Sequence, residues 1–247
     1  MGIITAKKGG YMGAKPTWKF ADRSGVWSSK DQYTLQKAEV WPKPVGKAMY
    51  GGYFAGYIKY GVEAWSGTNG EEYMLIIAPK SLGEAPTALQ YKTSATCNGY
   101  ESNNTSSQSS WDGYHNTYYL SVSYTQSPGT HPAAEYVTNL TIGGSSFWYI
   151  PSSGEMSVLV PSLTQHPWWQ QGGAEQFTFG TVVLNGSTVS PYCIYWTSRG
   201  DSCENTGTTG TAANYQPYGP GLVSGFPKTD QVFVRAIRRI AYPTEPS

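Results

Sequence analysis

Residues 139–155, with the sequence NLTIGGSSFWYIPSSGE, constrain the fold of this chain more than any other segment. Its two adjacent glycines favour a tight turn, because glycine readily adopts the positive φ angles that such turns need. An aromatic run at 147–150 follows and stops at a proline, which predicts a short strand. Ser152 or Ser153 is then placed to cap a helix that carries Glu155 in its first turn. The segment predicts strand, turn, strand and helix in close succession.

The remainder of the chain alternates short strand and helix patterns with long polar stretches. Residues 48–60 alternate small and aromatic residues with glycines, which indicates a strand lying close to a neighbouring backbone. The apolar run at 72–78 predicts a buried strand. We expect helices at 30–39, 131–138 and 153–163, further strands at 182–184, 192–197 and 232–240, and loops at 94–115, 164–176 and 199–230, whereas 116–124 fits either a strand or a helix. The pattern contains no internal repeat and predicts an α+β fold.

The composition is poor in charge and rich in aromatic residues. Charged residues make up 13% of the chain, about half the usual share of roughly 25%. Aromatic residues make up 15%, with 20 Tyr and 9 Trp. Tyr and Trp supply a large amphipathic contact area at a small cost in side-chain entropy. This composition is typical of an extracellular or particle-bound β-rich protein, with most of the aromatic residues in the core or between protomers.

Charge is distributed unevenly along the chain. Residues 1–47 hold nine basic and three acidic residues, a net charge of +6, whereas residues 48–227 hold four basic and eleven acidic residues, a net charge of −7. A basic N-terminal arm could dock electrostatically on an acidic neighbour, or it could be a solvated tail. The basic residues are too few and too scattered to indicate nucleic-acid binding.

Cysteine content and hydropathy indicate where the protein folds. Cys97, Cys193 and Cys203 form no CxxC pair, and although the last two could bridge a loop, an odd number favours free thiols in a protein folded in the cytosol. No apolar run approaches the roughly 18 residues of a membrane span. The N-terminus lacks the apolar core of a signal peptide, so we expect export, if it occurs, to follow assembly and lysis.

Several segments, in order over roughly residues 48–240, resemble the Lcl C-terminal-domain family, which is found on phage tail and other virion proteins and on bacterial collagen-like adhesins. The matching segments are YMLIIAPK (73–80), LQYKTS (89–94), DGYHNT (112–117), HPAAEYVTNLTIGGSSFWYIPSSGEM (131–156), QQGGAEQF (170–177), YWTS (195–198) and KTDQVFVRAIRR (228–239). Each motif alone is weak, but together and in order they are specific. The resemblance implies a C-type-lectin-like fold, with a small twisted antiparallel sheet, two short helices and long loops.

The N-terminal segment resembles a module that recurs at the start of phage virion proteins. Its sequence, SGVWSSKDQYTLQKAEVWP, spans residues 24–42. This resemblance implies two parts: an arm and short helix at 1–45 that attaches to the particle, and a C-type-lectin-like domain at 46–247. We expect Trp27, Tyr33 and Trp41 to make the attachment.

The residues do not predict catalysis, a cofactor or a bound metal. The chain lacks GxSxG, HExxH, GxGxxG and P-loop motifs, and its three histidines are dispersed. The Glu-Pro-Asn and Trp-Asn-Asp patterns of calcium-dependent lectins are absent as well. Asp201, Glu204 and Asn205 could hold an ion, although a solvated loop is the favoured interpretation.

Two groups of residues are expected to hold the domain together. Arg235 and Arg238 are three residues apart, so a strand would place them on opposite faces. Our hypothesis is that the inward arginine forms a bidentate pair with Glu155 and ties the last strand to the helix. Trp148 and Trp196 are expected in the core.

Candidate ligand-binding residues lie in the predicted loops. Trp168 and Trp169 are adjacent in a loop and cannot easily both be buried, so they stack on a sugar, pack on a neighbouring protomer or cover an edge of the core. Further candidates for carbohydrate contact are Tyr192, Arg199, Tyr215 and Tyr218.

The two resemblances, with the absence of catalytic motifs, imply a non-enzymatic phage virion protein. The leading hypothesis is a tail-fibre or tail-tip adhesin that binds a host-surface glycan through loops 164–176 and 199–230. The alternative is a purely structural component, such as a capsid decoration, head fibre or tail or baseplate adaptor, that uses the same loops for packing. Either protein would contact other virion proteins through its N-terminal arm. A homo-oligomer is expected, and a trimer is compatible with an adhesin.

Overall fold

The computed structural model describes residues 45–59, 72–94, 109, 111–121, 129–200, 209–216 and 219–241. The chain divides into one compact unit at Val45–Ile240 and a second that comprises Met1–Pro44 and Ala241–Ser247. The predicted helix at 30–39 and the expected attachment residues Trp27, Tyr33 and Trp41 lie outside the described residues.

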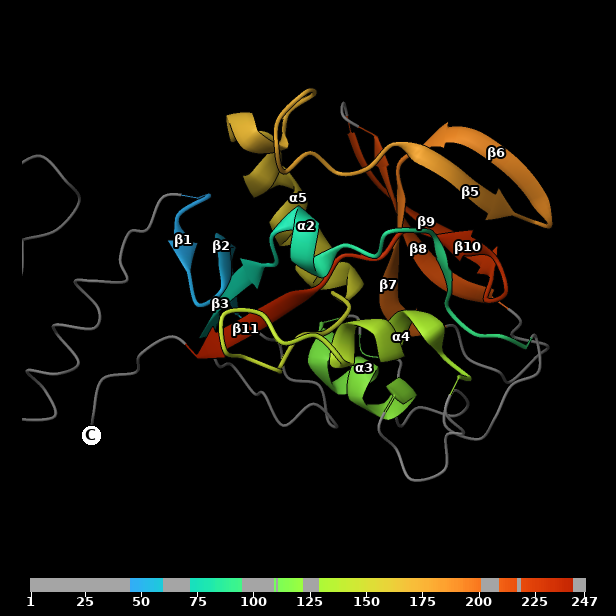
Figure 1. The fold of residues 1–247 in the computed structure, drawn as a ribbon, viewed down its shortest axis with the longest axis horizontal. Coiled ribbons are helices and arrows are strands. Elements are labelled where there is room, and N and C mark those ends of the chain that lie inside the picture. Colours follow the sequence, from blue (N-terminus) through green and yellow to red (C-terminus); the bar gives the residue numbers. More distant parts are fainter. Residues whose placement is uncertain are drawn as a thin grey trace, which may run out of the picture. The chain divides into compact units, whose positions relative to one another are not determined.

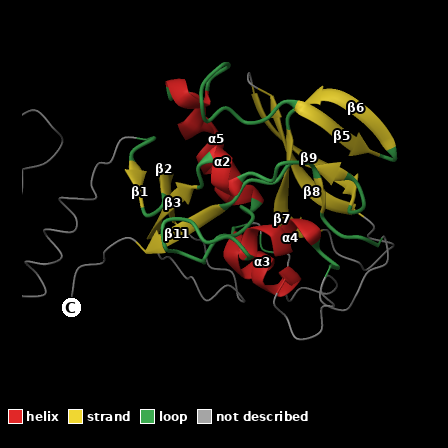
Figure 2. Cartoon of the chain, viewed as in Figure 1, coloured by secondary structure: helices red, strands yellow, loops and turns green. Residues whose placement is uncertain are grey.

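The described chain is a mixed α+β fold, as predicted, with short helices and antiparallel sheets (Figures 1 and 2). The helical elements are α2 (Lys80–Gly83), α3 (Gly113–Ser121), α4 (Pro132–Thr138), α5 (Ser153–Thr164) and the 3-10 turn η1 (Pro167–Trp169). The strands are β1 (Ala48–Met49), β2 (Gly52–Lys59), β3 (Glu72–Ile77), β4 (Leu89–Gln90), β5 (Gly180–Leu184), β6 (Ser187–Tyr192), β7 (Ile194–Gly200), β8 (Thr209–Gln216), β9 (Gly219–Pro227), β10 (Gln231–Val232) and β11 (Ile237–Ala241). No helix in the described part of the chain is long and apolar enough to cross a bilayer.

Over the residues that the structure describes, three small sheets form the framework, with strand orders β1-β2-β3-β11, β4-β10-β5-β6 and β7-β8-β9. The four residues from Met74 to Ile77 on β3 are all buried, because both faces of this strand are covered, so the predicted buried strand is confirmed. Gly52 lies so close to β3 that a Cβ would come within 2.3 Å of the carbonyl oxygen of Ile77. The predicted close approach of this strand to a neighbouring backbone is therefore confirmed.

Local signals correctly place two helices and one turn. In α4, Pro132 occupies the first turn, where its missing N–H has no partner to lose. In α5, the Ser152 side chain accepts from the Glu155 N–H while the Glu155 carboxylate accepts from the Ser152 N–H, which forms a capping box. Gly143 and Gly144 have φ angles of 60° and 76° and form the predicted tight turn.

Residues 147–150 do not form the predicted strand. Tyr149 makes a single bridge to Ile237, and the neighbouring backbone N–H of Ile150 donates to the Thr117 hydroxyl at 3.1 Å. A side chain of α3 thus takes the place of a strand partner, which stops the ladder after one pair.

The predicted loop at 199–230 is wrong over most of its length, because β8 and β9 pair as an antiparallel hairpin from Thr209↔Pro227 to Gln216↔Gly219. Four glycines, two alanines and two prolines lie in the strands of this hairpin, and such residues carry a weak strand signal. The strand predicted at 232–240 is split into β10 and β11. Between them, Phe233 and Arg235 make isolated bridges to Tyr195 and Glu84, because the chain passes there from one sheet to another.

Helix α3 resolves the ambiguous segment 116–124 in favour of a helix over the residues described, and it begins at Gly113, inside a predicted loop. Apolar side chains from α5, namely Met156, Leu159, Val160 and Leu163, are buried. This helix packs against β2, and its C-terminal end leads directly into the 164–176 loop.

Candidate functional site

The loop at 164–176, which was predicted as a binding surface, is a compact turn stabilised by its own hydrogen bonds. Helix α5 ends at Thr164, and η1 begins at Pro167. The backbone N–H of Trp168 donates to Nδ1 of His166 at 3.2 Å, and the N–H of Glu175 donates to the Trp168 carbonyl at 2.9 Å. The loop therefore closes on itself and presents its side chains in a defined arrangement.

The two adjacent tryptophans lie in opposite environments. Trp168 is 45% exposed, whereas Trp169 is 2% exposed. Both indoles pack edge-on against the ring of Tyr53, with centroids 5.5 and 5.6 Å away. The expectation that they are not both buried is confirmed. Trp169 closes the edge of the core, and Trp168 is available at the surface.

Polar, uncharged side chains flank the exposed indole along the chain. Gln165, Gln170 and Gln171 are exposed, and Gln170 donates to the Thr164 carbonyl over a long 3.4 Å. Amide groups both donate and accept hydrogen bonds, and an indole offers a flat apolar face with one N–H. This combination suits a neutral, hydroxyl-rich ligand.

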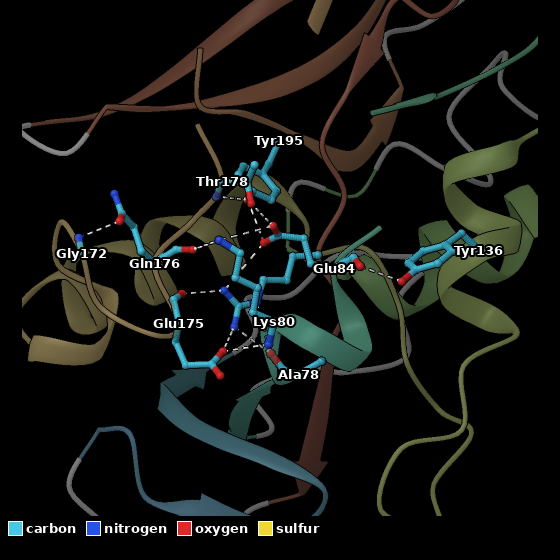
Figure 3. Close-up of polar contacts among 10 residues, drawn as sticks. Ala78, Lys80, Glu84, Tyr136, Gly172, Glu175, Gln176, Thr178 and Tyr195 are labelled. Carbon is cyan, nitrogen blue, oxygen red and sulfur yellow. Dashed lines mark hydrogen bonds and ion pairs between the residues drawn. The ribbon is translucent and has the colours of Figure 1, made fainter. Parts of the chain in front are cut away.

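A buried ion network attaches the loop to the body of the domain (Figure 3). Arg235 forms a close ion pair with the Glu175 carboxylate, and its Nη1 donates to the Glu175 carbonyl at 2.8 Å. Lys80 contributes two further bonds, from its backbone N–H to Glu175 Oε2 at 2.8 Å and from Nζ to the Gln176 carbonyl at 2.6 Å. Four donor groups thus fix two consecutive loop residues.

The same arginine also joins the loop to the central sheet. Arg235 is 2% exposed, and its Nε and Nη2 both donate to the Ala78 carbonyl, at 3.2 and 3.0 Å. Its Nη1 lies 3.8 Å from Glu84 Oε2. A planar guanidinium can serve all these acceptors at once, which the single ammonium of lysine cannot.

Glu84 extends the network toward β7 and α4. Its carboxylate accepts hydrogen bonds from Thr178 and, at 2.8 Å, from the Tyr195 hydroxyl. Burial, and next the nearby Glu84 charge, raise the pKa of Tyr195 well above its ordinary value. Tyr195 therefore remains a protonated donor, and the network acts as structural support.

The predicted pairing of Glu155 with Arg235 or Arg238 is wrong. Glu155 is fully buried, but its carboxylate accepts from the N–H groups of Gly113 and Ser152 and from the Tyr149 hydroxyl. Arg235 pairs with Glu175 instead. Arg235 is the inward arginine, whereas Arg238 is half-buried and its guanidinium lies over the Trp148 ring.

The tie between the last strand and the interior is made by a different pair. Arg239 Nη1 lies 2.7 Å from Oδ1 of Asp112, and the next residue, Gly113, donates to Glu155. Helix α5, which carries Glu155, and strand β11, which carries Arg239, are therefore linked through the start of α3. Arg239 and Glu175 both lie in segments that carry the family resemblance. Their spacing in the sequence, however, did not indicate which residues they would pair with.

The structure describes the side chains of some of the other predicted site residues but not of all of them. Trp148 and Trp196 are each 1% exposed, and their indole N–H groups donate to the carbonyls of Ser145 and Leu89, so their core position is confirmed. Tyr192, Arg199 and Tyr215 lie in β6, β7 and β8, with side chains outside the described residues. Tyr218, Asp201, Glu204 and Asn205 lie outside them entirely.

Metal binding and thiol reactivity depend on how the titratable side chains are arranged in the described part of the chain. No group of three or more His, Cys, Asp or Glu side chains there could hold a metal ion. Cys193 is a free, buried thiol, and burial, followed by the charge of Glu84, raises its pKa far above the ordinary value. A thiol that stays protonated is a poor nucleophile.

We expect Cys193 to resist iodoacetamide in the native protein at pH 8 and to react fully after unfolding in guanidinium, because both burial and the raised pKa suppress the thiolate. Mass spectrometry of the Cys193 peptide measures the labelled fraction. Rapid labelling of Cys193 under native conditions would contradict its buried position between β6 and β7.

No protein-family model, curated protein or solved structure matches this chain.

Proposed function

We propose that this chain is a non-enzymatic bacteriophage virion protein that binds a host-surface glycan through the loop at 164–176. The observation that carries the proposal is the exposure of Trp168 on a loop whose far end is held by the buried Arg235–Glu175 pair. A rigid aromatic anchor loses little conformational entropy on binding. The exposed glutamine amides beside it supply hydrogen bonds to sugar hydroxyls.

The assignment to a virion rests on the ordered resemblance to the Lcl C-terminal-domain family and to the N-terminal phage module. In this proposal the described domain is C-type-lectin-like and faces outward. The basic arm at 1–45 attaches it to an acidic partner on the particle, as its net charge favours.

Replacing Trp168 with alanine is expected to weaken binding of the purified protein to host cells by roughly 10- to 30-fold, as for an aromatic residue that dominates an interface. Because nearly half of the Trp168 side chain is exposed, the free energy of unfolding should fall by only about 1 kcal/mol. Flow cytometry with fluorescently labelled protein measures the binding.

Trp111→Ala is the matched control, because Trp111 is similarly exposed, at 40%, but belongs to a different part of the domain. Its replacement should leave cell binding unchanged. Equal losses for both variants would show that any exposed indole contributes, and unchanged binding in the Trp168 variant would overturn the proposal.

A purely structural virion role is the second candidate, and the exposed apolar side chains favour it. Phe147 is 62% exposed and Leu82 55%, and exposed apolar surface often marks contacts with other proteins. Purified protein that binds no host cells, on a particle where Trp168 is buried against a neighbour, would support this second role.

A further inference from the structure

A pocket on a different part of the domain is lined by five aromatic side chains. It has a volume of about 210 Å³. Helix α3, the end of α4, which packs against α3, and the segment 146–149 form its walls. The aromatic lining residues are Tyr114, Tyr118, Phe147, Trp148 and Tyr149.

The rim of the pocket is exposed, whereas its floor is fixed. Phe147 is 62% and Tyr118 42% exposed. Behind them, the Trp148 indole donates to the Ser145 carbonyl at 2.9 Å, and the Tyr149 hydroxyl donates to Glu155 at 2.7 Å. These bonds hold the inner rings in place, so the pocket exists before a ligand arrives and binding need not organise it.

Some hydroxyl groups that line the pocket already form hydrogen bonds within the described chain, and others do not. The hydroxyl of Thr117 bonds to the Ile150 backbone and that of Thr138 to the Ala134 carbonyl. Among the described residues, the hydroxyls of Tyr114, Tyr118 and Ser146 have no hydrogen-bond partner. Three hydroxyl groups that can each donate and accept are therefore available beside aromatic rings.

The charge and size of the pocket narrow the ligand class. None of its described lining residues is charged. Two arginines lie over its rings: Arg239, over Tyr114, is paired with Asp112, and Arg238, over Trp148, donates to the Tyr50 carbonyl. A neutral ligand is therefore favoured. The volume is below the roughly 300–1,000 Å³ of pockets that enclose drug-sized molecules, so it accommodates one ring. A pyranose has an apolar face for an aromatic ring and hydroxyl groups for Tyr and Ser.

We propose that this pocket binds a single neutral hexose residue of a glycan, as a second sugar site separate from Trp168. This inference rests on the proposed adhesin function for its biological role. Binding of a hexose to the pocket can nevertheless be measured without host cells. From the binding free energy per non-hydrogen atom that is typical of small ligands, we expect a dissociation constant on the order of millimolar for one hexose.

The test is saturation-transfer difference NMR on the purified full-length chain. The probes are the methyl glycosides of glucose, galactose, mannose and N-acetylglucosamine, with methyl glucuronide as the charged comparison and p-cresol as a mimic of a tyrosine side chain. We expect a saturable signal from at least one neutral glycoside. Phe147→Ala should weaken it about 2- to 10-fold, and Tyr118→Phe, which removes only a hydroxyl group, should weaken it without affecting folding.

Trp111→Ala, which removes an exposed indole that belongs to neither proposed sugar site, is the matched variant and should leave this signal intact, whereas Trp168→Ala should remove only the part of the signal that comes from the loop at 164–176. A signal that disappears in Trp168→Ala but persists in both pocket variants would overturn the pocket proposal, as would binding of p-cresol alone or a clear preference for methyl glucuronide. If the pocket binds hexose while the protein fails to bind host cells, the pocket proposal stands and the adhesin function falls. If the protein binds cells through Trp168 and no hexose enters the pocket, the adhesin function stands and the pocket proposal falls.

Discussion

Replacing Arg235 with alanine is expected to lower the free energy of unfolding by about 3–5 kcal/mol, as when one partner of a buried ion pair is removed. The change would leave the carboxylates of Glu175 and Glu84 without the guanidinium, and the Ala78 carbonyl without its two donors. Chemical denaturation followed by tryptophan fluorescence measures the loss.

Arg238→Ala is the matched control for this prediction. Arg238 lies on the same segment but is half-buried, and its described contacts are the Trp148 ring and a 3.4 Å bond to the Tyr50 carbonyl. Its removal should cost no more than about 1 kcal/mol. Arg235→Lys should lie between the two, because it keeps the charge but loses the fork. Similar losses in Arg235→Ala and Arg238→Ala would contradict the role of Arg235 as the main support of the loop.

Glu155→Ala is expected to destabilise the domain by about 3 kcal/mol or more, since each buried polar group left without a partner costs about 1–3 kcal/mol. The described contacts of the Glu155 carboxylate include hydrogen bonds from two backbone N–H groups and from the Tyr149 hydroxyl. Its loss would also remove half of the capping box of α5. The same denaturation measurement applies.

Glu135 is the corresponding residue of α4 and serves as the control. It also lies in the first turn, and its carboxylate accepts from the N–H groups of Gly129 and His131, but the first of these bonds is exposed and the second only partly buried. Glu135→Ala should therefore cost about 0.5–1.5 kcal/mol. Equal costs at both positions would show that capping alone, and not burial, explains Glu155.

The support of the loop also bears on the proposed function. The Arg235–Glu175 pair and Lys80 hold residues 175 and 176, while Trp168 bonds through its carbonyl to Glu175. A ligand that stacks on Trp168 therefore meets a surface already positioned by buried contacts.

Features that depend on neighbouring residues were predictable from the sequence. The capping box at Ser152 and Glu155, the proline that opens α4 and the turn at Gly143 and Gly144 each involve residues within four positions of one another. The buried strand β3 was equally clear, because a continuous apolar run is its own signal.

Features that depend on distant residues were not. Arg235 and Glu175 are 60 residues apart, and the sequence offers several carboxylates that an inward arginine could reach. Choosing among them requires the path of the chain, and the choice of Glu155 was wrong for that reason. The strand expected at 147–150 failed likewise, because a Thr117 hydroxyl from another element replaced its strand partner.

By itself, the sequence determined the α+β class, the ends of α4 and α5, and the rule that Trp168 and Trp169 could not share one environment. Only the tertiary structure decided that Trp168 is the exposed indole, that Glu175 receives Arg235, and that β8 and β9 pair. The physical reason is that caps and turns are set by bonds within a few residues. Burial and ion pairing depend instead on which surfaces meet when elements far apart in the chain pack together.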